Sequence, residues 1–178
     1  MSFIEKESVF DALWSYVLNN IEYTVGETLE DITQKWDTRM LEVAKLHASW
    51  SKDPSTKTGT VIVRPDKTEC SHGYNGFPRG ISDKIELYEN RVEKYRRIIH
   101  AEVNALLTAK EPLSGYTLYV WPLMPCERCA INIIQSGIIK VVAPVILKKY
   151  EDRWGESFEL SASLFNEAGV DLVLYDFN

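Results

Sequence analysis

The sequence contains few cysteines and no long apolar run, and both shortages limit what this chain can be. Three cysteines among 178 residues are too few for a disulfide framework, and they fit a reducing cytosol. No apolar run reaches the roughly 20 residues that a membrane-spanning helix needs. The N-terminus lacks the basic-then-apolar pattern of a signal peptide. We therefore expect a cytoplasmic protein.

Positive charge is also in short supply. Lys and Arg number 20 against 26 Asp and Glu, which gives a net charge of -6 and a pI of about 5.2. Proteins bind nucleic-acid backbones chiefly through Lys and Arg, so we expect no nucleic-acid partner. Repeats and low-complexity segments are missing as well. The length suits one domain with a proper core.

Residues 1–36 are predicted to form a helical, acidic extension to a domain at residues 37–178. This segment holds seven acidic and two basic residues, so it carries most of the net negative charge. Apolar residues recur at helical spacing between Phe10 and Leu18, which indicates a short amphipathic helix. Asp37 is a candidate N-cap for the helix that follows. Nothing in the extension suggests chemistry.

From Asp37 onward, helical and extended patterns alternate, which is typical of an α/β protein with helices layered on a sheet. We expect strands at 58–63, in a segment ending near Tyr74, and at 116–121, 138–142 and 170–175. We expect helices from residue 37, in part of 83–99, and at 100–109, 126–135 and 157–168.

One motif carries chemistry. The chain reads His100-Ala101-Glu102 and later Pro125-Cys126-Glu127-Arg128-Cys129, which is the pattern of the zinc deaminases. One His and two Cys give zinc three ligands and leave a position open for an activated water. Glu102 lies beside the ligand His100 and can carry protons. The motif predicts hydrolytic removal of an exocyclic amino group.

The alternative is a structural zinc site, which normally has four protein ligands. The only other candidate ligands of these types are His47, Cys70 and His72. We expect His47 to be packed or surface-exposed on an otherwise apolar helix. Cys70 and His72 alternate along a predicted strand and should face the same side. A second metal there would need other ligands, so we do not expect one.

With these motifs the chain resembles the deoxycytidylate (dCMP) deaminases of the cytidine deaminase superfamily. The resemblance covers roughly residues 41–174 and rests mainly on Ser51–Thr56, Gly73–Gly80, His100–Ala105 and Pro125–Ala130. It implies a three-layer α/β/α sandwich with a five-stranded mixed sheet, and a homo-oligomer for which a hexamer is favoured. It also implies conversion of dCMP to dUMP for thymidylate synthesis, with dCTP plus Mg²⁺ as activator and dTTP as inhibitor.

The resemblance also gives individual residues their roles. It implies that His100, Cys126 and Cys129 bind Zn²⁺ and that Glu102 is the catalytic proton carrier. Substrate contacts would come from Asn75 and Tyr95. The effector-binding loop would include Gly76, Phe77 and Arg79.

Positive side chains gather in the loop and insert that precede the motif: Arg79, Arg91, Lys94, Arg96 and Arg97. They either recognise a nucleotide phosphate or pair with nearby glutamates at helical spacing. The sequence favours neither interpretation over the other.

The segment Trp121–Pro125 departs from the family pattern, with Met124 where an aromatic residue is common. Because this segment would border the base pocket, CMP, a modified cytosine or a purine nucleotide are alternative substrates. A polynucleotide substrate is disfavoured by the acidic chain. A non-catalytic nucleotide-binding regulator is disfavoured by the intact Glu102. We expect Trp121 and Trp154 to serve the core or an interface.

Overall fold

The computed structural model describes residues 29–176 and contains a five-stranded mixed sheet with strand order β2-β1-β3-β4-β5. The strands are β1 (Gly59–Val63), β2 (Glu69–Tyr74), β3 (Thr117–Trp121), β4 (Lys140–Pro144) and β5 (Asp171–Tyr175). β1 pairs antiparallel with both β2 and β3, whereas β3, β4 and β5 run parallel to one another. The predicted α/β class and five-stranded mixed sheet are confirmed.

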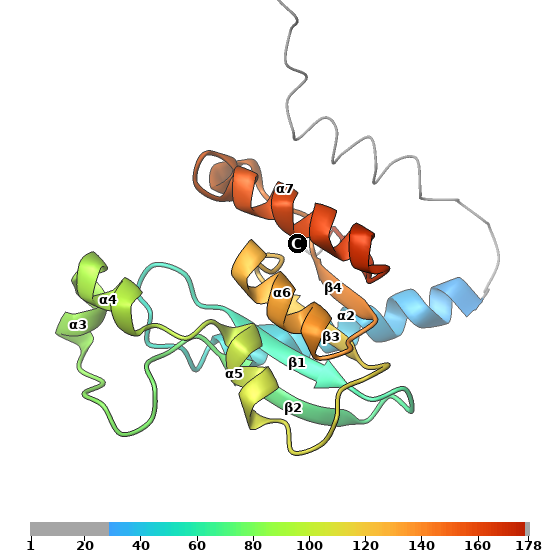
Figure 1. The fold of residues 1–178 in the computed structure, drawn as a ribbon, viewed down its shortest axis with the longest axis horizontal. Helices are drawn as coiled ribbons and strands as arrows, with labels where there is room; N and C mark the ends of the chain where they lie inside the picture. The colour runs from blue at the N-terminus through green and yellow to red at the C-terminus, as the bar shows by residue number, and fades with distance from the viewer. Residues whose placement is uncertain (1–28, 177–178) are drawn as a thin grey trace, which may run out of the picture.

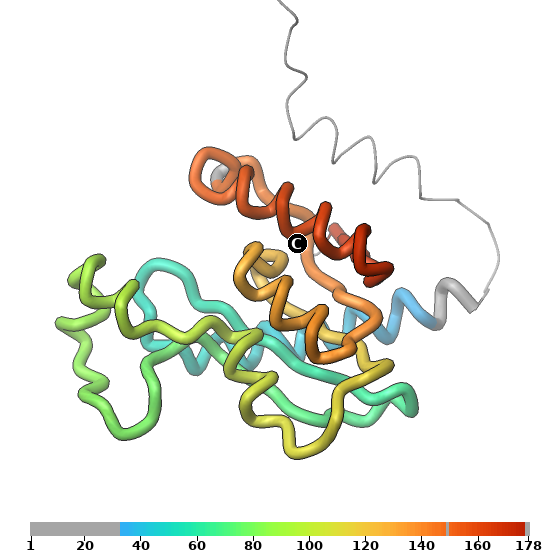
Figure 2. The backbone as a smooth tube through the Cα atoms, viewed as in Figure 1, coloured from blue at the N-terminus to red at the C-terminus, as the bar shows by residue number. Residues whose placement is uncertain are grey.

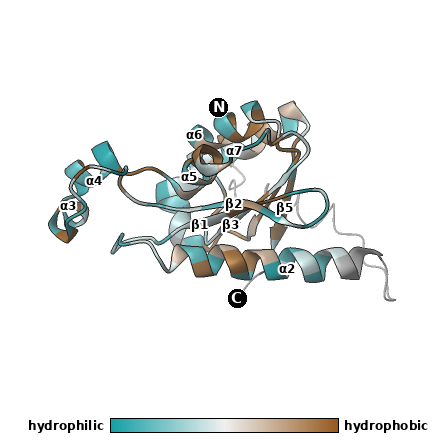
Figure 3. Ribbon diagram, turned by 90° about the horizontal axis from the view of Figure 1, so that it is seen from below, coloured by the Kyte–Doolittle hydropathy of each residue, from teal (hydrophilic) through white to brown (hydrophobic). Residues whose placement is uncertain are grey.

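Helices cover both faces of the sheet and make three layers. They are α2 (Leu29–Ala48), α3 (Ile85–Glu89), α4 (Arg91–Arg97), α5 (Ala101–Thr108), α6 (Glu127–Gln135) and α7 (Glu151–Ala168), with a 3-10 turn η1 (Lys148–Tyr150) before α7. α2 lies under one face, and α5, α6 and α7 lie over the other (Figures 1 and 3). The short helices α3 and α4 belong to an excursion that extends beyond the sheet (Figure 2).

Each face of the sheet has its own apolar core. On the α2 side, Leu41 and Ala44 pack against Val61, Tyr119 and Val142. The larger cluster lies on the opposite side, between the sheet and α5, α6 and α7. The interior strand β1, which lies between β2 and β3, is buried along its whole length, as expected for a strand covered on both faces.

Gly59 allows α2 to approach β1 closely. A Cβ at Gly59 would lie 2.1 Å from the carbonyl oxygen of Ala44 and 2.3 Å from the backbone nitrogen of Ala48. Any side chain here would push the helix away from the sheet. Glycine therefore sets the distance between the lower helix and the sheet.

The prediction that Asp37 caps a helix is wrong, because α2 already begins at Leu29. Asp37 is fully buried and accepts hydrogen bonds from Tyr119 Oη at 2.6 Å and Tyr175 Oη at 3.0 Å. Tyr119 bonds to Oδ1, whereas Tyr175 and Lys140 Nζ, which lies 2.8 Å away, share Oδ2. These tertiary partners outweigh the local preference of aspartate for helix ends.

α2 also crosses the predicted domain boundary between residues 36 and 37. The amphipathic helix expected around Phe10–Leu18 lies outside the described residues, so the division into extension and domain stays a prediction. Among the described residues, no helix combines the length and the apolar character needed to cross a membrane.

Elsewhere the predicted elements agree with the structure apart from their ends. The largest difference is α7, which begins at Glu151 rather than at residue 157. Gly155 lies inside this helix, and no side chain caps its first turn, so the usual signal for a helix start is missing. β4 ends at Pro144, two residues beyond the expected end.

Candidate active site

The structure brings His100, Cys126 and Cys129 together at the starts of two helices. His100 is the N-cap residue of α5 and Cys126 that of α6, while Cys129 lies in the first turn of α6. His100 Nδ1 lies 3.5 Å from Cys126 Sγ and 3.4 Å from Cys129 Sγ. Both cysteines are buried. Residues 26 and 29 positions apart in sequence therefore converge as the motif predicts.

These spacings fit a zinc ion. With Zn–N near 2.1 Å and Zn–S near 2.3 Å, tetrahedral ligands lie roughly 3.6 Å apart, which is close to the observed separations. The three side chains form one of the His/Cys/Asp/Glu groups in the described part of the chain that could hold a metal. Three ligands satisfy the pattern of a catalytic zinc site, in which a fourth position is left open.

Hydrogen bonds among the three candidate ligand side chains shift their pKa values. Hydrogen bonding from Cys129, supported by the neighbouring His100, lowers the pKa of Cys126 to about 4. The bond that Cys129 makes to Cys126, together with burial, raises the pKa of Cys129. The bond with Cys126 raises the pKa of His100 to about 9. A thiolate thus lies between two proton donors at a helix N-terminus, and metal binding would displace those protons.

Glu102 is buried beside this group, in the first turn of α5. Burial raises the pKa of its carboxyl, and the charge of His100 acts in the opposite direction. A carboxyl with a raised pKa in a pocket can both accept and return a proton near neutral pH. Glu102 is therefore a candidate proton carrier.

The pocket above the ligands combines apolar and polar walls. Leu123, Met124, Trp154 and Phe158 supply apolar surface. Trp154 thus lines the pocket as well as packing against the core. Trp121 instead packs against the α2-side core, with Lys45 Nζ 5.5 Å from its ring centroid. The polar wall contains His100, Glu102, Asp53, Ser55, Asn75, Lys94, Tyr95 and Arg153.

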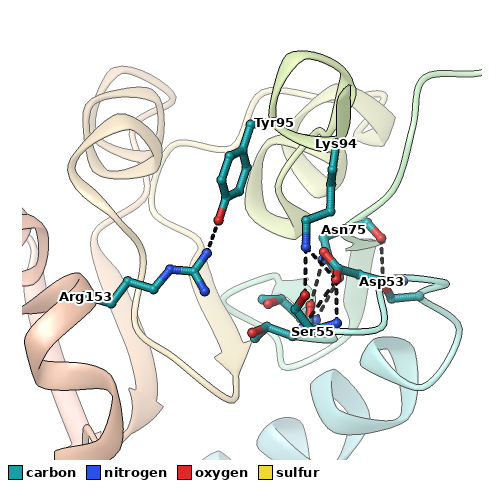
Figure 4. A network of polar contacts seen from close by, with 9 residues as sticks. Asp53, Ser55, Asn75, Lys94, Tyr95 and Arg153 are labelled. Carbon is teal, nitrogen blue, oxygen red and sulfur yellow. Dashed lines mark hydrogen bonds and ion pairs between the residues drawn. The ribbon is translucent and has the colours of Figure 1, made fainter. Parts of the chain in front are cut away.

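Asn75 lies at the end of β2 and holds one wall of the pocket in place. Its Oδ1 accepts a hydrogen bond from the Thr58 backbone nitrogen at 2.8 Å, and its Nδ2 donates to the Thr56 carbonyl at 2.9 Å. A longer contact of 3.4 Å joins Nδ2 to Asp53 (Figure 4). The amide is thus engaged with residues 53–58 while it lines the pocket.

A buried ion pair that the sequence did not reveal forms part of the same wall. Lys94 Nζ lies 3.0 Å from Asp53 Oδ1 and 3.0 Å from Ser55 Oγ. The side chains of Lys94 and Asp53 are each only 6% exposed. The cation from α4 is therefore committed to the loop after α2 (Figure 4).

Tyr95 and Arg153 face each other across the pocket mouth from α4 and α7 (Figure 4). The Arg153 guanidinium donates a hydrogen bond to Tyr95 Oη, and it lies 5.9 Å from the centroid of the tyrosine ring. Sequence reasoning missed Arg153, because the predicted helix began after it. Because Arg153 lies in a helix and far in sequence from the zinc motif, no pattern in the sequence marked it as a pocket residue.

The other basic residues of the insert do not line this pocket. Arg96 and Arg97 both pair with Glu93, at 3.4 and 2.7 Å, which agrees with the ion-pairing interpretation. The Arg91 guanidinium lies 5.4 Å from the Tyr95 ring centroid.

The predicted effector residues lie together elsewhere. Gly76, Phe77 and Arg79 line a second hollow, which also contacts β2 and α5. Phe77 stacks on Tyr88 with ring centroids 4.0 Å apart, and its backbone nitrogen donates to Tyr88 Oη at 3.2 Å. Burial and the bond to Asp83 raise the pKa of Tyr88 to about 12, so this hydroxyl stays protonated at neutral pH.

The mixed sheet and the one-His, two-Cys site with its buried glutamate define the class as a zinc-type hydrolytic deaminase. Comparison with known proteins makes the assignment more specific. Residues 34–145 match the cytidine and deoxycytidylate deaminase zinc-binding region. The chain belongs to this family.

Two relatives indicate how near the match is. An uncharacterized deaminase encoded in the luxG 3' region of Aliivibrio fischeri is 43% identical over 139 residues, covering 78% of this chain and 92% of the relative. The deoxycytidylate deaminase of Homo sapiens is 37% identical over 144 residues, covering 76% and 77% of the two chains.

A solved structure has the same fold. The dCMP deaminase of the cyanophage S-TIM5, in complex with dCMP and dUMP, aligns with a TM-score of 0.61 at 23% identity. The alignment covers 82% of this chain and 97% of that one.

Proposed function

We propose that this chain converts dCMP and water to dUMP and ammonia. The observation that carries the proposal is the convergence of His100, Cys126 and Cys129, together with the pocket that His100, Cys126 and the buried Glu102 line. The identity of 37% with human deoxycytidylate deaminase over 144 residues supports this choice of substrate.

In the proposed mechanism, His100, Cys126 and Cys129 hold zinc, which when bound supplies a Lewis acid for activating water. The Glu102 carboxylate accepts a proton from the water that attacks C4 of the cytosine. Glu102 passes this proton to the ring nitrogen N3. It then accepts the second proton, from the new hydroxyl on C4, and gives it to the amine, so that the C4–N bond breaks, the C4 carbonyl forms and ammonia leaves. Leu123, Met124 and Phe158 exclude bulk water around the base, so the charges that develop are stabilised by fixed groups.

For the substrate phosphate we propose Arg153. Lys94 also lines the pocket, but its ammonium is already paired with Asp53 at 3.0 Å. Arg153 is exposed and lines the pocket mouth together with Tyr95. A guanidinium offers the fork of donors that suits a phosphate. Asn75 and Tyr95 are proposed to contact the sugar and base from the opposite wall.

Regulation and assembly extend the proposal. We propose that dCTP with Mg²⁺ binds the second hollow at Gly76, Phe77 and Arg79, and that the chain works as a cytoplasmic homo-oligomer, with a hexamer favoured. The support is that these residues line a hollow of their own, apart from the pocket with Glu102.

The decisive variant is Glu102→Gln, which keeps the size of the side chain and removes its proton-accepting role. We expect turnover of dCMP to fall by at least about 10²–10⁴-fold, while zinc content by metal analysis and the unfolding midpoint stay near those of the parent. Glu89→Gln, at an exposed position on α3, is the matched control. Substantial activity in Glu102→Gln would refute the mechanism.

The substrate is tested by ammonia release from dCMP, CMP, deoxycytidine and single-stranded DNA, each with and without dCTP and Mg²⁺. Preference for dCMP supports the proposal. Activity confined to another nucleotide would keep the chemistry and overturn the substrate. Zinc content without any turnover would overturn the enzymatic proposal.

A further inference from the structure

Three potential metal ligands lie together between α2 and the edge strand β2, outside the active site. His47 comes from the last turn of α2, and Glu69 and His72 come from β2. Each residue offers one ligand atom, and these atoms lie within 4.8 Å of one another. Because α2 and α5 cover opposite faces of the sheet (Figure 3), this cluster and the catalytic ligands lie on different sides of the molecule.

An irregularity in β2 creates the cluster. Residues three apart in a regular strand point to opposite faces, as Glu69 and His72 would. The register shifts here, however, because Ile62 pairs with Ser71 whereas Val63 pairs with Glu69. This β-bulge leaves Cys70 as the extra residue. Glu69 and His72 therefore meet on one face, with His72 Nδ1 2.9 Å from Glu69 Oε1.

The same bulge corrects one expectation from the sequence. Cys70 and His72 do not share a face, since Cys70 packs against the α5-side core and His72 stacks on His47 from α2. The further ligands that a second metal would require are His47 and Glu69, which the sequence separates by 22 positions.

The ring nitrogens of His47 are poorly satisfied in hydrogen bonding. Its side chain is 7% exposed, and its buried Nδ1 has no hydrogen-bond partner. Its Nε2 lies 3.7 Å from Glu69 Oε1, beyond a normal hydrogen bond. Two atoms bound to one transition metal at about 2.1 Å lie roughly 3.0–3.5 Å apart, so this gap is close to what an ion would bridge.

We propose that His47, Glu69 and His72 form a second metal site for a divalent transition metal of the zinc type. Two imidazoles and one carboxylate are a donor set that suits Zn²⁺, and also Ni²⁺ and Cu²⁺. Water completes the coordination on the exposed side, where Glu69 is 42% and His72 is 46% exposed.

Binding requires one local movement. The His47 and His72 rings are stacked, with centroids 4.1 Å apart and planes 6° apart, whereas a ring nitrogen binds a metal in the plane of its ring. His47 is held by burial and by the edge of Trp50, whose ring centroid is 4.7 Å away. His72 is the less enclosed of the two rings, at 46% exposure, so we expect its ring to be the one that rotates, with a rearrangement of its contact to Glu69. Metal binding must offset the energy lost when the two rings unstack, so we expect a weaker affinity for metal here than at the catalytic site.

The three histidines of the chain make the site directly observable. Untagged full-length protein is first loaded with one equivalent of Zn²⁺ and is labelled with ¹⁵N in the histidine rings. Further Zn²⁺ is then added and followed by NMR and by calorimetry. We expect a second saturable equivalent that shifts the ring signals of His47 and His72 and leaves those of His100 in place.

His72→Gln and Glu69→Gln should each weaken this second equivalent by at least tenfold, and both positions are exposed enough to tolerate the change. Glu86→Gln, an exposed carboxylate on α3, is the matched control and should leave it unchanged. Unmoved His47 and His72 signals, or an affinity that His72→Gln and Glu69→Gln do not alter, would overturn the proposal. Deaminase activity is not the readout, so the outcome is independent of the proposed function.

Discussion

Replacing Lys94 by Met tests whether the ion pair with Asp53 holds the pocket wall together. The two side chains are each 6% exposed, with Nζ and Oδ1 3.0 Å apart. Removing one partner of a buried pair costs about 3–5 kcal/mol, because the other charge stays buried without compensation. Asp53 retains the Ser55 backbone nitrogen at 2.8 Å, which favours the lower end of that range. We therefore expect a loss of about 3 kcal/mol in the free energy of unfolding.

Urea unfolding of the zinc-loaded protein, followed by tryptophan fluorescence and circular dichroism, measures this loss. In thermal unfolding, a loss of 1 kcal/mol lowers the melting temperature of a chain of this length by about 2–4 °C, so the melting temperature of Lys94→Met should fall by roughly 6–12 °C. The double variant Asp53→Asn/Lys94→Met removes both charges and should be more stable than Lys94→Met alone.

The partly exposed pair Arg97–Glu93 provides the control. Its side chains are 36% and 29% exposed, so Arg97→Met should cost no more than about 1 kcal/mol. A loss of that small size for Lys94→Met, or a double variant less stable than Lys94→Met, would refute the assignment of Lys94 as a buried structural cation.

Two further predictions concern the active site itself. Arg153→Ala should raise the KM for dCMP by about tenfold or more, as expected for losing a hydrogen bond to a charged group, and should leave deoxycytidine turnover unchanged. Arg128→Ala, at an exposed position on α6, is the control. Equal effects of Arg153→Ala on both substrates would exclude a phosphate contact. In the metal-free protein, the alkylation rate of Cys126 should stay nearly constant between pH 6 and 8, because its pKa of about 4 means that it is already a thiolate. Burial raises the pKa of Cys70, so the alkylation rate of Cys70 should increase with pH. Mass spectrometry of the modified peptides distinguishes the two cysteines, and a Cys126 rate that rises about tenfold per pH unit would contradict the prediction.

The grouping of the candidate metal ligands could be predicted because the pattern that carries it is local in sequence. His100 and Glu102 share one turn, Cys126 and Cys129 share another, and a helix start places each pair. Arg153 could not be predicted, because its role depends on how α7 lies across the pocket from Tyr95. Spacing along the chain contains no information about that contact.

The second cluster shows the same limit more sharply. Strand periodicity predicted that Cys70 and His72 share a face, and one extra residue in the β2 register reverses that relationship. A bulge depends on pairing with β1, so the β2 sequence alone does not reveal it. The Asp37 error has a similar origin, since its partners Tyr119, Lys140 and Tyr175 lie 82 to 138 positions away.

The edge strand β2 explains how this fold can position catalytic groups at one of its borders. An edge strand has unpaired backbone groups, and α5 covers them: Asn104 Nδ2 donates to the Tyr74 carbonyl at 2.8 Å and Thr108 Oγ1 to the His72 carbonyl at 3.0 Å. The contact is close only because Gly73 has no side chain, since a Cβ there would lie 2.3 Å from the Ala101 carbonyl.

This contact holds the first turn of α5 in place relative to β2. His100 caps α5 and Glu102 lies in its first turn, while Asn75 follows the last residue of β2 and lines the same pocket. A candidate metal ligand, a candidate proton carrier and a pocket wall are therefore held relative to one another by a single helix–strand pair. Cys126, which also lines the pocket, and Cys129 come instead from the start of α6. A zinc ion held by His100, Cys126 and Cys129 would join the two parts, so we expect its removal to disturb the pocket more than the sheet.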